Sequence, residues 1–290
     1  MIGRPGSSHV STWVGRERTE SDVITARLAE SFDATFDRPS RHYKVGDLAP
    51  LGIHWLLCPP RVPQRALGPD GHPSRGGFLP PIELPRRMWA SGRIDFLEPL
   101  RVGEEVHLAS RIISVIPKQG TTGALVFVDV DHTFFTTMGV RLRERQTIVF
   151  RGPPRGEDTS THINNQPSPS IQRWSRRRTI NPDAALLFRY SALTFNGHRI
   201  HYDQDYVRNV EGYPNLVVHA PLTATLLLQM FEDRFGTGAV TFSFRAVRPL
   251  FCSKPIELYG NEDGNRFVLE ARDEEHCVAM SAQASMTISQ

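Results

Sequence analysis

Several features that would define other protein classes are missing from this 290-residue chain. The only cysteines are Cys58, Cys252 and Cys277, which are widely spaced and form no CxxC pair. The sequence therefore predicts neither a disulfide framework nor a cysteine zinc site. No apolar run reaches the roughly 18 residues that a transmembrane helix requires, so we expect no membrane span. A GxGxxG after a strand, a P-loop and a GxSxG elbow are also missing, which argues against dinucleotide, nucleoside-triphosphate and serine-hydrolase chemistry.

Strong charge is missing as well. The 34 basic residues nearly balance the 31 acidic ones, which leaves a net charge of +3. Nucleic-acid binding requires a concentrated basic face, and "RWSRRR" at 173–178 is the only dense basic cluster. We interpret it as a solvated segment at a domain edge, so the sequence predicts neither a nucleic-acid nor a membrane partner. The N-terminal stretch "MIGRPGSSHVSTW" lacks the apolar core of a signal peptide, and a cytoplasmic location is expected, with a mitochondrial one left open.

A polar segment divides the chain. Residues 153–172, "PPRGEDTSTHINNQPSPSIQ", are rich in Pro, Ser, Thr and Asn and contain almost no apolar residues. This composition is typical of a linker. It separates an N-terminal domain, 1–152, from a C-terminal domain, 173–290, and both have ordinary domain sizes.

Both parts show a helical pattern followed by strand patterns. In the first part, apolar residues spaced i, i+4 predict an amphipathic helix within 20–37, and β-branched and aromatic residues predict strands between 88 and 150. In the second part we expect a short helix at 203–210 and a long apolar helix at 219–236, followed by strands to the end. The repeated order suggests two copies of one fold.

The long apolar helix suggests which fold this is. Its segment "PLTATLLLQM" is apolar on nearly every face, which full burial inside a curved sheet requires. A helix wrapped by a curved antiparallel sheet is the hotdog architecture. The prediction is therefore an α+β double hotdog, with two curved antiparallel sheets that each wrap a central helix. The Gly/Pro segment 68–77 is predicted to be a mobile loop between the elements.

The stretch "FNGHRIHYD", 195–203, concentrates polar chemistry immediately before the short helix. It allows three interpretations. It is a turn with a helix cap supplied by Asp203, it is a catalytic pair, or its histidines together with His219 bind zinc. No cysteine or carboxylate lies at zinc-ligand spacing, so we expect no metal, but the residues alone do not separate the first two interpretations.

A family resemblance favours the catalytic pair. The segment 189–228, and less specifically 84–106, resembles the MaoC-like or hydratase 2 family of double-hotdog dehydratases. It is most similar to the branch with mesaconyl-C4-CoA hydratase and the mitochondrial hydroxyacyl-thioester dehydratases. The resemblance implies reversible addition of water to an α,β-unsaturated acyl thioester of coenzyme A or a carrier protein, without metal or other cofactor. Where the wider family has an aspartate followed five residues later by a histidine, this chain has Asn196 and His201.

The resemblance also implies roles for these residues. His201 would be the general base in hydration and the general acid in dehydration, and Asn196 would orient the water or hydroxyl. The amide of Ala220, where the family usually has glycine, would stabilise the thioester oxyanion at the start of the buried helix, since the next residue, Pro221, has no N–H. Further candidate substrate contacts are Tyr190, Phe195, His198, Arg199, Tyr202, His219 and Pro221. Candidate phosphate contacts are Arg86, Arg87 and Arg93.

The N-terminal part lacks the catalytic motif. Its nearest counterpart to the buried helix is "APLGIHWLLC", 49–58, where His54 has no partner at the required spacing. The family's division of labour implies that this hotdog shapes the acyl tunnel and that each chain has one active site. A homodimer is plausible. Two other functions stay open: a biosynthetic dehydratase, isomerase or cyclase that uses the same pocket, and a non-catalytic acyl-thioester binding protein.

Overall fold

The strands form a single sheet. The computed structural model describes residues 10–120, 123–152 and 174–286. Its ten strands run in the order β1-β3-β4-β5-β2-β7-β10-β9-β8-β6, and every neighbouring pair is antiparallel. The strands are β1 (Glu17–Val23), β2 (Arg86–Phe96), β3 (Glu105–Gly120), β4 (Gly123–Thr136), β5 (Gly139–Arg151), β6 (Arg176–Ile180), β7 (Val240–Ala246), β8 (Ile256–Asp263), β9 (Arg266–Arg272) and β10 (Val278–Met286). The predicted linker, 153–172, lies outside the described residues, and the domain boundaries remain predictions.

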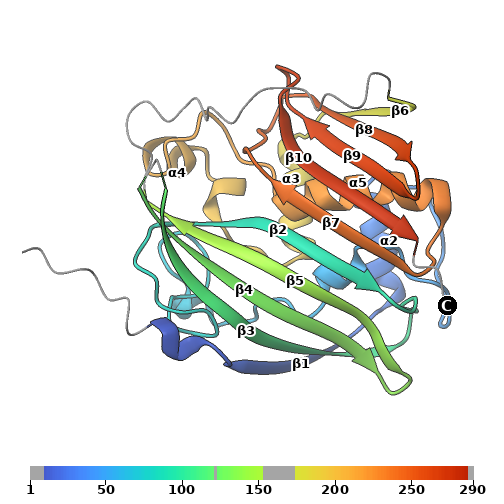
Figure 1. The fold of residues 1–290 in the computed structure, drawn as a ribbon, viewed down its shortest axis with the longest axis horizontal. Coiled ribbons are helices and arrows are strands. Elements are labelled where there is room, and N and C mark those ends of the chain that lie inside the picture. Colours follow the sequence, from blue (N-terminus) through green and yellow to red (C-terminus); the bar gives the residue numbers. More distant parts are fainter. Residues whose placement is uncertain (1–9, 121–122, 153–173, 287–290) are drawn as a thin grey trace, which may run out of the picture.

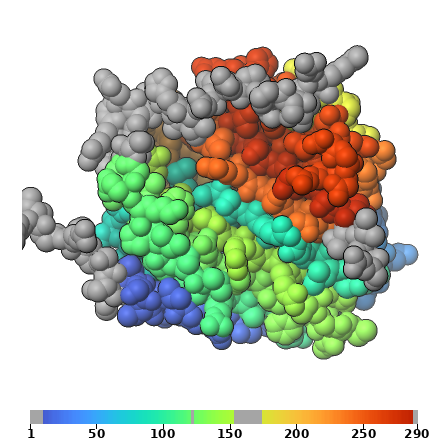
Figure 2. Space-filling model, in the orientation of Figure 1, coloured from blue at the N-terminus to red at the C-terminus, as the bar shows by residue number. Residues whose placement is uncertain are grey.

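The strand order contains an internal repeat. Counted outward from the centre, β2-β5-β4-β3-β1 in the first half matches β7-β10-β9-β8-β6 in the second. The central strands β2 and β7 pair directly, with Ser91 opposite Arg245 and Asp95 opposite Thr241. In Figure 2 the two halves meet along β2, the teal band between green and orange surfaces. The hotdog expectation therefore holds, but the two predicted sheets are joined edge to edge into one.

Matching backbone hydrogen bonds align the halves residue by residue. Ala49 N–H donates to Leu100 O over 2.9 Å, and Val218 N–H donates to Leu250 O over 2.8 Å. Two further equivalent pairs are Val102 N to Asp47 O with Cys252 N to Leu216 O, and Gly103 N to Ile24 O with Ser253 N to Pro182 O. The sequence repeats weakly here too, as "LEPL" at 97–100 and "VRPL" at 247–250.

The helices differ more between the halves than the strands do. The α-helices are α2 (Ala26–Thr35), α3 (Ala184–Leu193), α4 (Gln204–Asn209) and α5 (Ala220–Phe235), and the 3-10 helices are η1 (Ser11–Trp13), η2 (Ile53–Leu56), η3 (Gln64–Ala66) and η4 (Arg199–His201). The apolar α5 packs against β7 to β10 and lies behind them in Figure 1. Its counterpart in the first half is the one-turn η2. A central helix was predicted for both halves, and among the described residues the second half alone has a full one. None of the helices in the described ranges is long and apolar enough to cross a membrane.

One sequence prediction needs correction, and one is refined. The helix expected within 20–37 is a strand up to Val23, paired with β3, and the helix begins only at Ala26, where Thr25 accepts a hydrogen bond from Leu28 N–H. The β-branched residues at this junction favour the extended conformation. In the basic cluster, Arg176 and Arg177 are exposed to solvent, as predicted, and they belong to an edge strand, β6, paired with β8. Charged side chains on an edge strand discourage pairing with other chains.

Candidate active site

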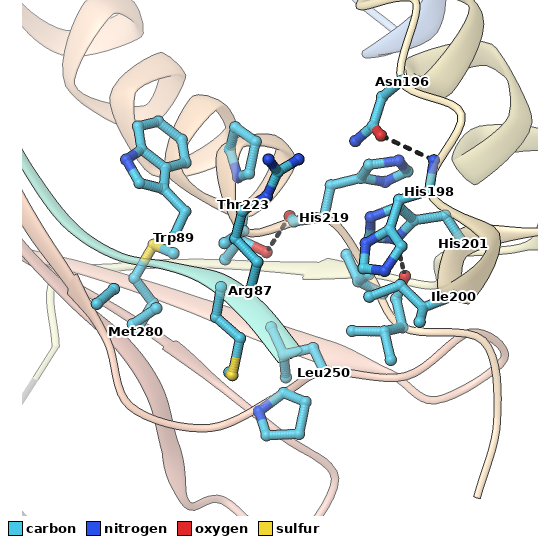
Figure 3. A pocket seen from close by; sticks show the side chains of 18 of the residues that line it. Arg87, Trp89, Asn196, His198, Ile200, His201, His219, Thr223, Leu250 and Met280 are labelled. Carbon is cyan, nitrogen blue, oxygen red and sulfur yellow. Dashed lines mark hydrogen bonds between the residues drawn. The ribbon is translucent and has the colours of Figure 1, made fainter. Parts of the chain in front are cut away.

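One cavity of about 450 Å³ is lined by residues of both halves. The second half contributes the C-terminal end of α3, the start of α5 and the polar segment between them. The first half contributes residues of β2 and β5 and Trp55 of η2. Eight sequence candidates line it: Arg87, Tyr190, Asn196, His198, His201 and His219, together with Ala220 and Pro221 at the start of α5. Figure 3 shows the histidines on one side and Arg87, Trp89 and Met280 on the opposite side. Most of the remaining lining is apolar, as an acyl pocket requires.

His201 is held in one orientation and one tautomer. The side chain is buried, and its Nδ1 lies 2.6 Å from the carbonyl oxygen of Val217. Because a carbonyl only accepts hydrogen bonds, Nδ1 must carry the proton, and Nε2 of the neutral ring keeps a free lone pair. Burial lowers the pKa of His201 to about 4, despite the opposing effect of the Val217 carbonyl. At neutral pH the ring is therefore an uncharged proton acceptor.

His219 supports this ring from one side. The two imidazoles stack with centroids 3.6 Å apart and planes inclined by 18°. Nε2 of His219 lies 2.9 Å from the hydroxyl of Ser191, and burial holds the pKa of His219 well below its usual value. Tyr190 is fully buried behind it, with ring centroids 5.0 Å apart. His219 is thus a neutral wall residue that restricts the motion of His201.

Asn196 keeps the NH₂ of its amide available as a hydrogen-bond donor. Its Oδ1 accepts a hydrogen bond of 3.0 Å from His198 N–H, drawn in Figure 3. The amide NH₂ remains to donate to a bound water, hydroxyl or carbonyl oxygen. Phe195, the preceding residue, adopts φ 49°. This left-handed conformation turns the chain sharply between α3 and the Asn196 turn.

The start of α5 offers a site for negative charge. The first amides of a helix have no partner within it. Pro221 has no N–H, Thr223 N–H donates to His219 O, and Leu222 is fully buried. Ala220 is the residue at this helix start whose N–H and exposure suit a ligand in the cavity, which it lines.

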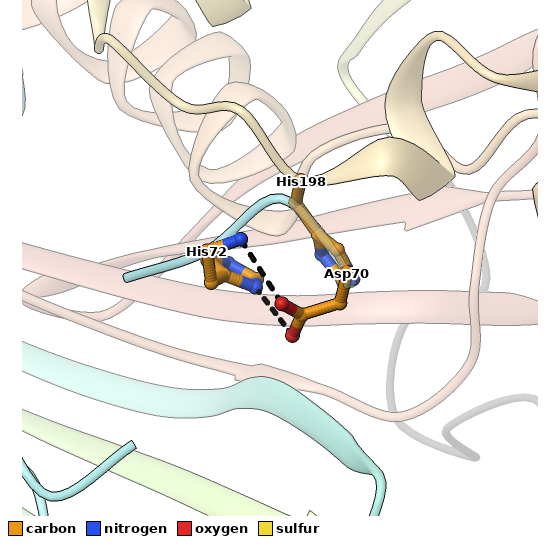
Figure 4. Close-up of side chains that lie close together, drawn as sticks. All are labelled: Asp70, His72 and His198. Atoms are coloured by element: carbon orange, nitrogen blue, oxygen red, sulfur yellow. Dashed lines mark hydrogen bonds and ion pairs between the residues drawn. The ribbon is translucent and has the colours of Figure 1, made fainter. Parts of the chain in front are cut away.

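Asp70, His72 and His198 form a cluster beside the cavity (Figure 4). One nitrogen or carboxylate oxygen from each residue lies within 4.8 Å of the others, so these are the described residues that could hold a metal ion. However, Asp70 Oδ1 accepts from His72 N–H over 3.0 Å, and Oδ2 lies 3.2 Å from His72 Nδ1. The His72 and His198 rings lie 4.0 Å apart between centroids. A metal would have to replace the Asp70–His72 hydrogen bonds, and the cluster is also explained without one.

Sequence reasoning missed His72, which lines the cavity from the segment expected to be a mobile loop. That segment is packed against the turn that carries Asn196 and His198. Arg199 N–H donates to Asp70 O over 2.9 Å, and a Cβ on Gly71, which has φ +83°, would lie 1.9 Å from the Gly197 oxygen. Glycine is needed at Gly71 for this approach. No local signal could reveal it, because the contact joins residues more than a hundred positions apart.

Five other candidates do not line the cavity. The side chains of Phe195 and Tyr202 are largely exposed, and the Tyr202 hydroxyl donates to Gly197 O. Arg199 pairs with Asp203, and Arg93 pairs with Asp95 on the surface. Arg86 is buried in an ion pair with Glu211. Asp203 also caps α4, as predicted, by accepting from Tyr206 N–H.

Comparisons with known proteins agree with this geometry. Residues 52–252 match the family model "Hydroxyacyl-thioester dehydratase type 2". The chain is 40% identical to mesaconyl-C(4)-CoA hydratase of Chloroflexus aurantiacus over 275 residues, which cover 94% of this chain and 96% of that one. Among solved structures, a MaoC-like dehydratase from Phytophthora capsici has a TM-score of 0.69 at 15% identity, covering 98% of this chain and 100% of the other. A Mycobacterium tuberculosis protein described as a double hotdog has a TM-score of 0.56 at 11% identity, with 95% and 96% coverage.

The two solved structures support the fold, and the family model and the mesaconyl-C(4)-CoA hydratase match identify the lineage. Together with the joined hotdog halves and the histidine-lined cavity, they show that the chain belongs to the hydroxyacyl-thioester dehydratase type 2 family of MaoC-like double-hotdog hydro-lyases.

Proposed function

We propose that this hydro-lyase adds water reversibly across the Cα–Cβ bond of an enoyl thioester, with His201 as the base. Family membership makes it an enzyme of enoyl and hydroxyacyl thioesters. The observation that carries the catalytic assignment is the His201 Nδ1 bond to Val217 O, because it leaves Nε2 unprotonated in the cavity. The other polar side chains that this turn contributes to the cavity lining are the amide of Asn196 and a second neutral histidine, His198.

In hydration, Nε2 of His201 takes a proton from water as the water oxygen bonds to Cβ. The electrons of the double bond move toward the thioester, whose carbonyl oxygen gains negative charge. The imidazolium then returns the proton to Cα, so one O–H bond breaks while C–O and C–H bonds form. Dehydration is the reverse. Since Asn196 cannot release a proton at neutral pH, one imidazole both takes and returns it.

Two neutral donors assist. The Ala220 N–H, at the positive end of the α5 dipole, stabilises the developing oxyanion of the thioester. The Asn196 NH₂ donates to the oxygen of the attacking water or leaving hydroxyl. In hydration this hydrogen bond occupies one lone pair of the water oxygen and leaves the other to attack Cβ, and in dehydration it stabilises the departing hydroxyl. The His198 N–H fixes the amide in place. Neither donor needs a net charge, which suits a buried apolar cavity.

The test is hydration of a panel of coenzyme A thioesters, from crotonyl to dodecenoyl, together with mesaconyl-C4-CoA, which the similar Chloroflexus enzyme is named for. Loss of the conjugated-thioester absorbance reports turnover. His201→Ala should lower kcat about 10³-fold, within the range typical of a lost general base. His42→Ala is the matched control, because the His42 side chain is 97% exposed. Full activity in His201→Ala, or no turnover of any thioester by folded wild-type protein, would refute the proposal.

A further inference from the structure

Two consecutive arginines on β2 have opposite surroundings. Arg86 is buried, and its Nε lies 3.1 Å from Glu211 Oε2, while its guanidinium stacks over Tyr213. Arg87 points into the active-site cavity, as Figure 3 shows. Its guanidinium has no hydrogen bond or ion pair with any residue in the described ranges. Asp70 attracts it only from beyond ion-pair distance, and both Asp70 oxygens already bind His72.

The active-site cavity itself offers Arg87 no acidic partner. None of the described residues that line it is Asp or Glu, and its second cation, Arg248, is already paired with Asp273 over 2.9 Å. Burial lowers the pKa of Arg87, but an arginine remains charged at neutral pH. A desolvated cation without a partner is costly, and such a cost is offset when a ligand supplies the anion.

We propose that Arg87 binds a carboxylate on the acyl group, and that the preferred substrate is a monothioester of an unsaturated dicarboxylic acid. This inference rests on the proposed hydration. The planar guanidinium matches a carboxylate bidentately. The phosphates of coenzyme A fit less well, because the whole pantetheine arm separates them from the thioester. Arg87 lines the same cavity as His201, so its partner must lie close to the reacting carbons.

A matched pair of substrates tests this. Crotonyl-CoA and the mono-CoA thioester of fumaric acid differ only in a methyl or a carboxylate on Cβ. Arg87→Met should lower kcat/KM for the fumaryl thioester about 100-fold, as expected when one member of a buried charged pair is removed, and should change crotonyl-CoA hydration little. Arg87→Lys should retain part of the preference. Arg143→Met, on an exposed position of β5, is the control. Comparing variants on one substrate cancels the intrinsic reactivity of that substrate.

Equal losses on both thioesters would assign Arg87 to the shared coenzyme moiety or to folding, and thermal unfolding separates those two. No loss on either would remove Arg87 from the site. Calorimetric binding of the saturated pair, succinyl-CoA and butyryl-CoA, provides a readout without turnover. If wild-type protein favours succinyl-CoA and Arg87→Met does not, Arg87 binds the carboxylate even if the hydration proposal fails.

Discussion

The same corner of the fold occurs twice in this protein, and it is open in one half and closed in the other. In the second half, the residues around Val218 and Leu250 line a cavity of about 450 Å³. In the first half, the equivalent residues around Ala49 and Leu100 enclose about 10 Å³. The backbone hydrogen bonds at the two corners match within 0.1 Å, as 2.9 and 2.8 Å. The backbone frame therefore does not create the site.

Side-chain size and chain length explain the difference. Phe96 fills the first corner, whereas Ala246 stands at the equivalent position in the second. The chain between α3 and Val217 also contains η4 and α4, and it brings Asn196, His198 and His201 to the cavity, whereas the chain between α2 and Leu48 is much shorter and has no helix. The proposed catalytic groups thus belong to a segment added to the repeat, which agrees with the general separation of fold and function.

The largest expected effect comes from opening the closed corner. Phe96→Ala removes a ring that is buried against His54, with centroids 5.4 Å apart, and leaves a cavity in the first half. We expect a loss of about 3–5 kcal/mol in the free energy of unfolding, measured by denaturant titration. The kcat/KM of the folded enzyme should change little, since no catalytic residue faces that corner.

The control for this variant is Leu97→Ala, at the neighbouring position, which is 37% exposed. It should change the free energy of unfolding by less than about 0.5 kcal/mol. A similarly small effect of Phe96→Ala would mean that Phe96 is not what closes the corner.

Closing the open corner should have the next largest effect. Ala246→Phe copies the first-half residue into the active-site cavity, beside Leu250 and Met280. The ring would displace the acyl chain, and a displacement of about 1 Å can cost on the order of 100-fold in rate. We expect about that loss of kcat/KM for dodecenoyl-CoA, a smaller one for crotonyl-CoA, and little change in thermal unfolding.

Ala124→Phe, on an exposed position of β4, is the matched control and should leave kinetics unchanged. If Ala246→Phe retained wild-type activity on the whole panel, the acyl chain would have to occupy a different part of the cavity.

How much of this could be predicted from the sequence follows from the range of the interactions. The strand patterns and the apolar pattern of α5 each lie within one segment of the chain, so the sequence was enough to predict these elements. The buried helix is apolar all round, and β-branched residues alternate in the strands. The first-half counterpart of α5 was located correctly at His54, but its reduction to a single turn was not foreseen. The apolar residues of the segment 49–58 suit either a single turn or a longer helix.

The site was predictable only in the part that a single segment carries. Asn196, His198 and His201 fall within six residues, and a family resemblance drew attention to them. The closure of the site by His72 and the unpaired state of Arg87 depend on contacts between the halves. The ion pair that keeps Arg86 out of the cavity joins it to Glu211, 125 positions away, so tertiary packing sets it. The partner of Arg93 is Asp95, two residues away on the same strand.

The smallest expected effect is a pH dependence of kcat/KM, which distinguishes His201, a buried histidine of the second half, from His54, a buried histidine of the first. His201 must be neutral to accept a proton, and burial lowers its pKa to about 4, so kcat/KM should be flat at neutral pH and fall tenfold per unit below about pH 4. His54, in the closed corner, is also buried and neutral, with its pKa lowered by burial to about 3, but it reaches no substrate. His54→Met should therefore keep the same acid limb.

Because the folded pKa of His201 lies below the unfolded value of about 6.5, its contribution to stability is present above that pH and is lost as the pH falls. Circular dichroism at each pH must show that the enzyme is folded while the rate declines. In folded wild-type enzyme, an acid limb near pH 6.5 would mean that the catalytic base titrates as an exposed imidazole, contrary to the buried His201 described above.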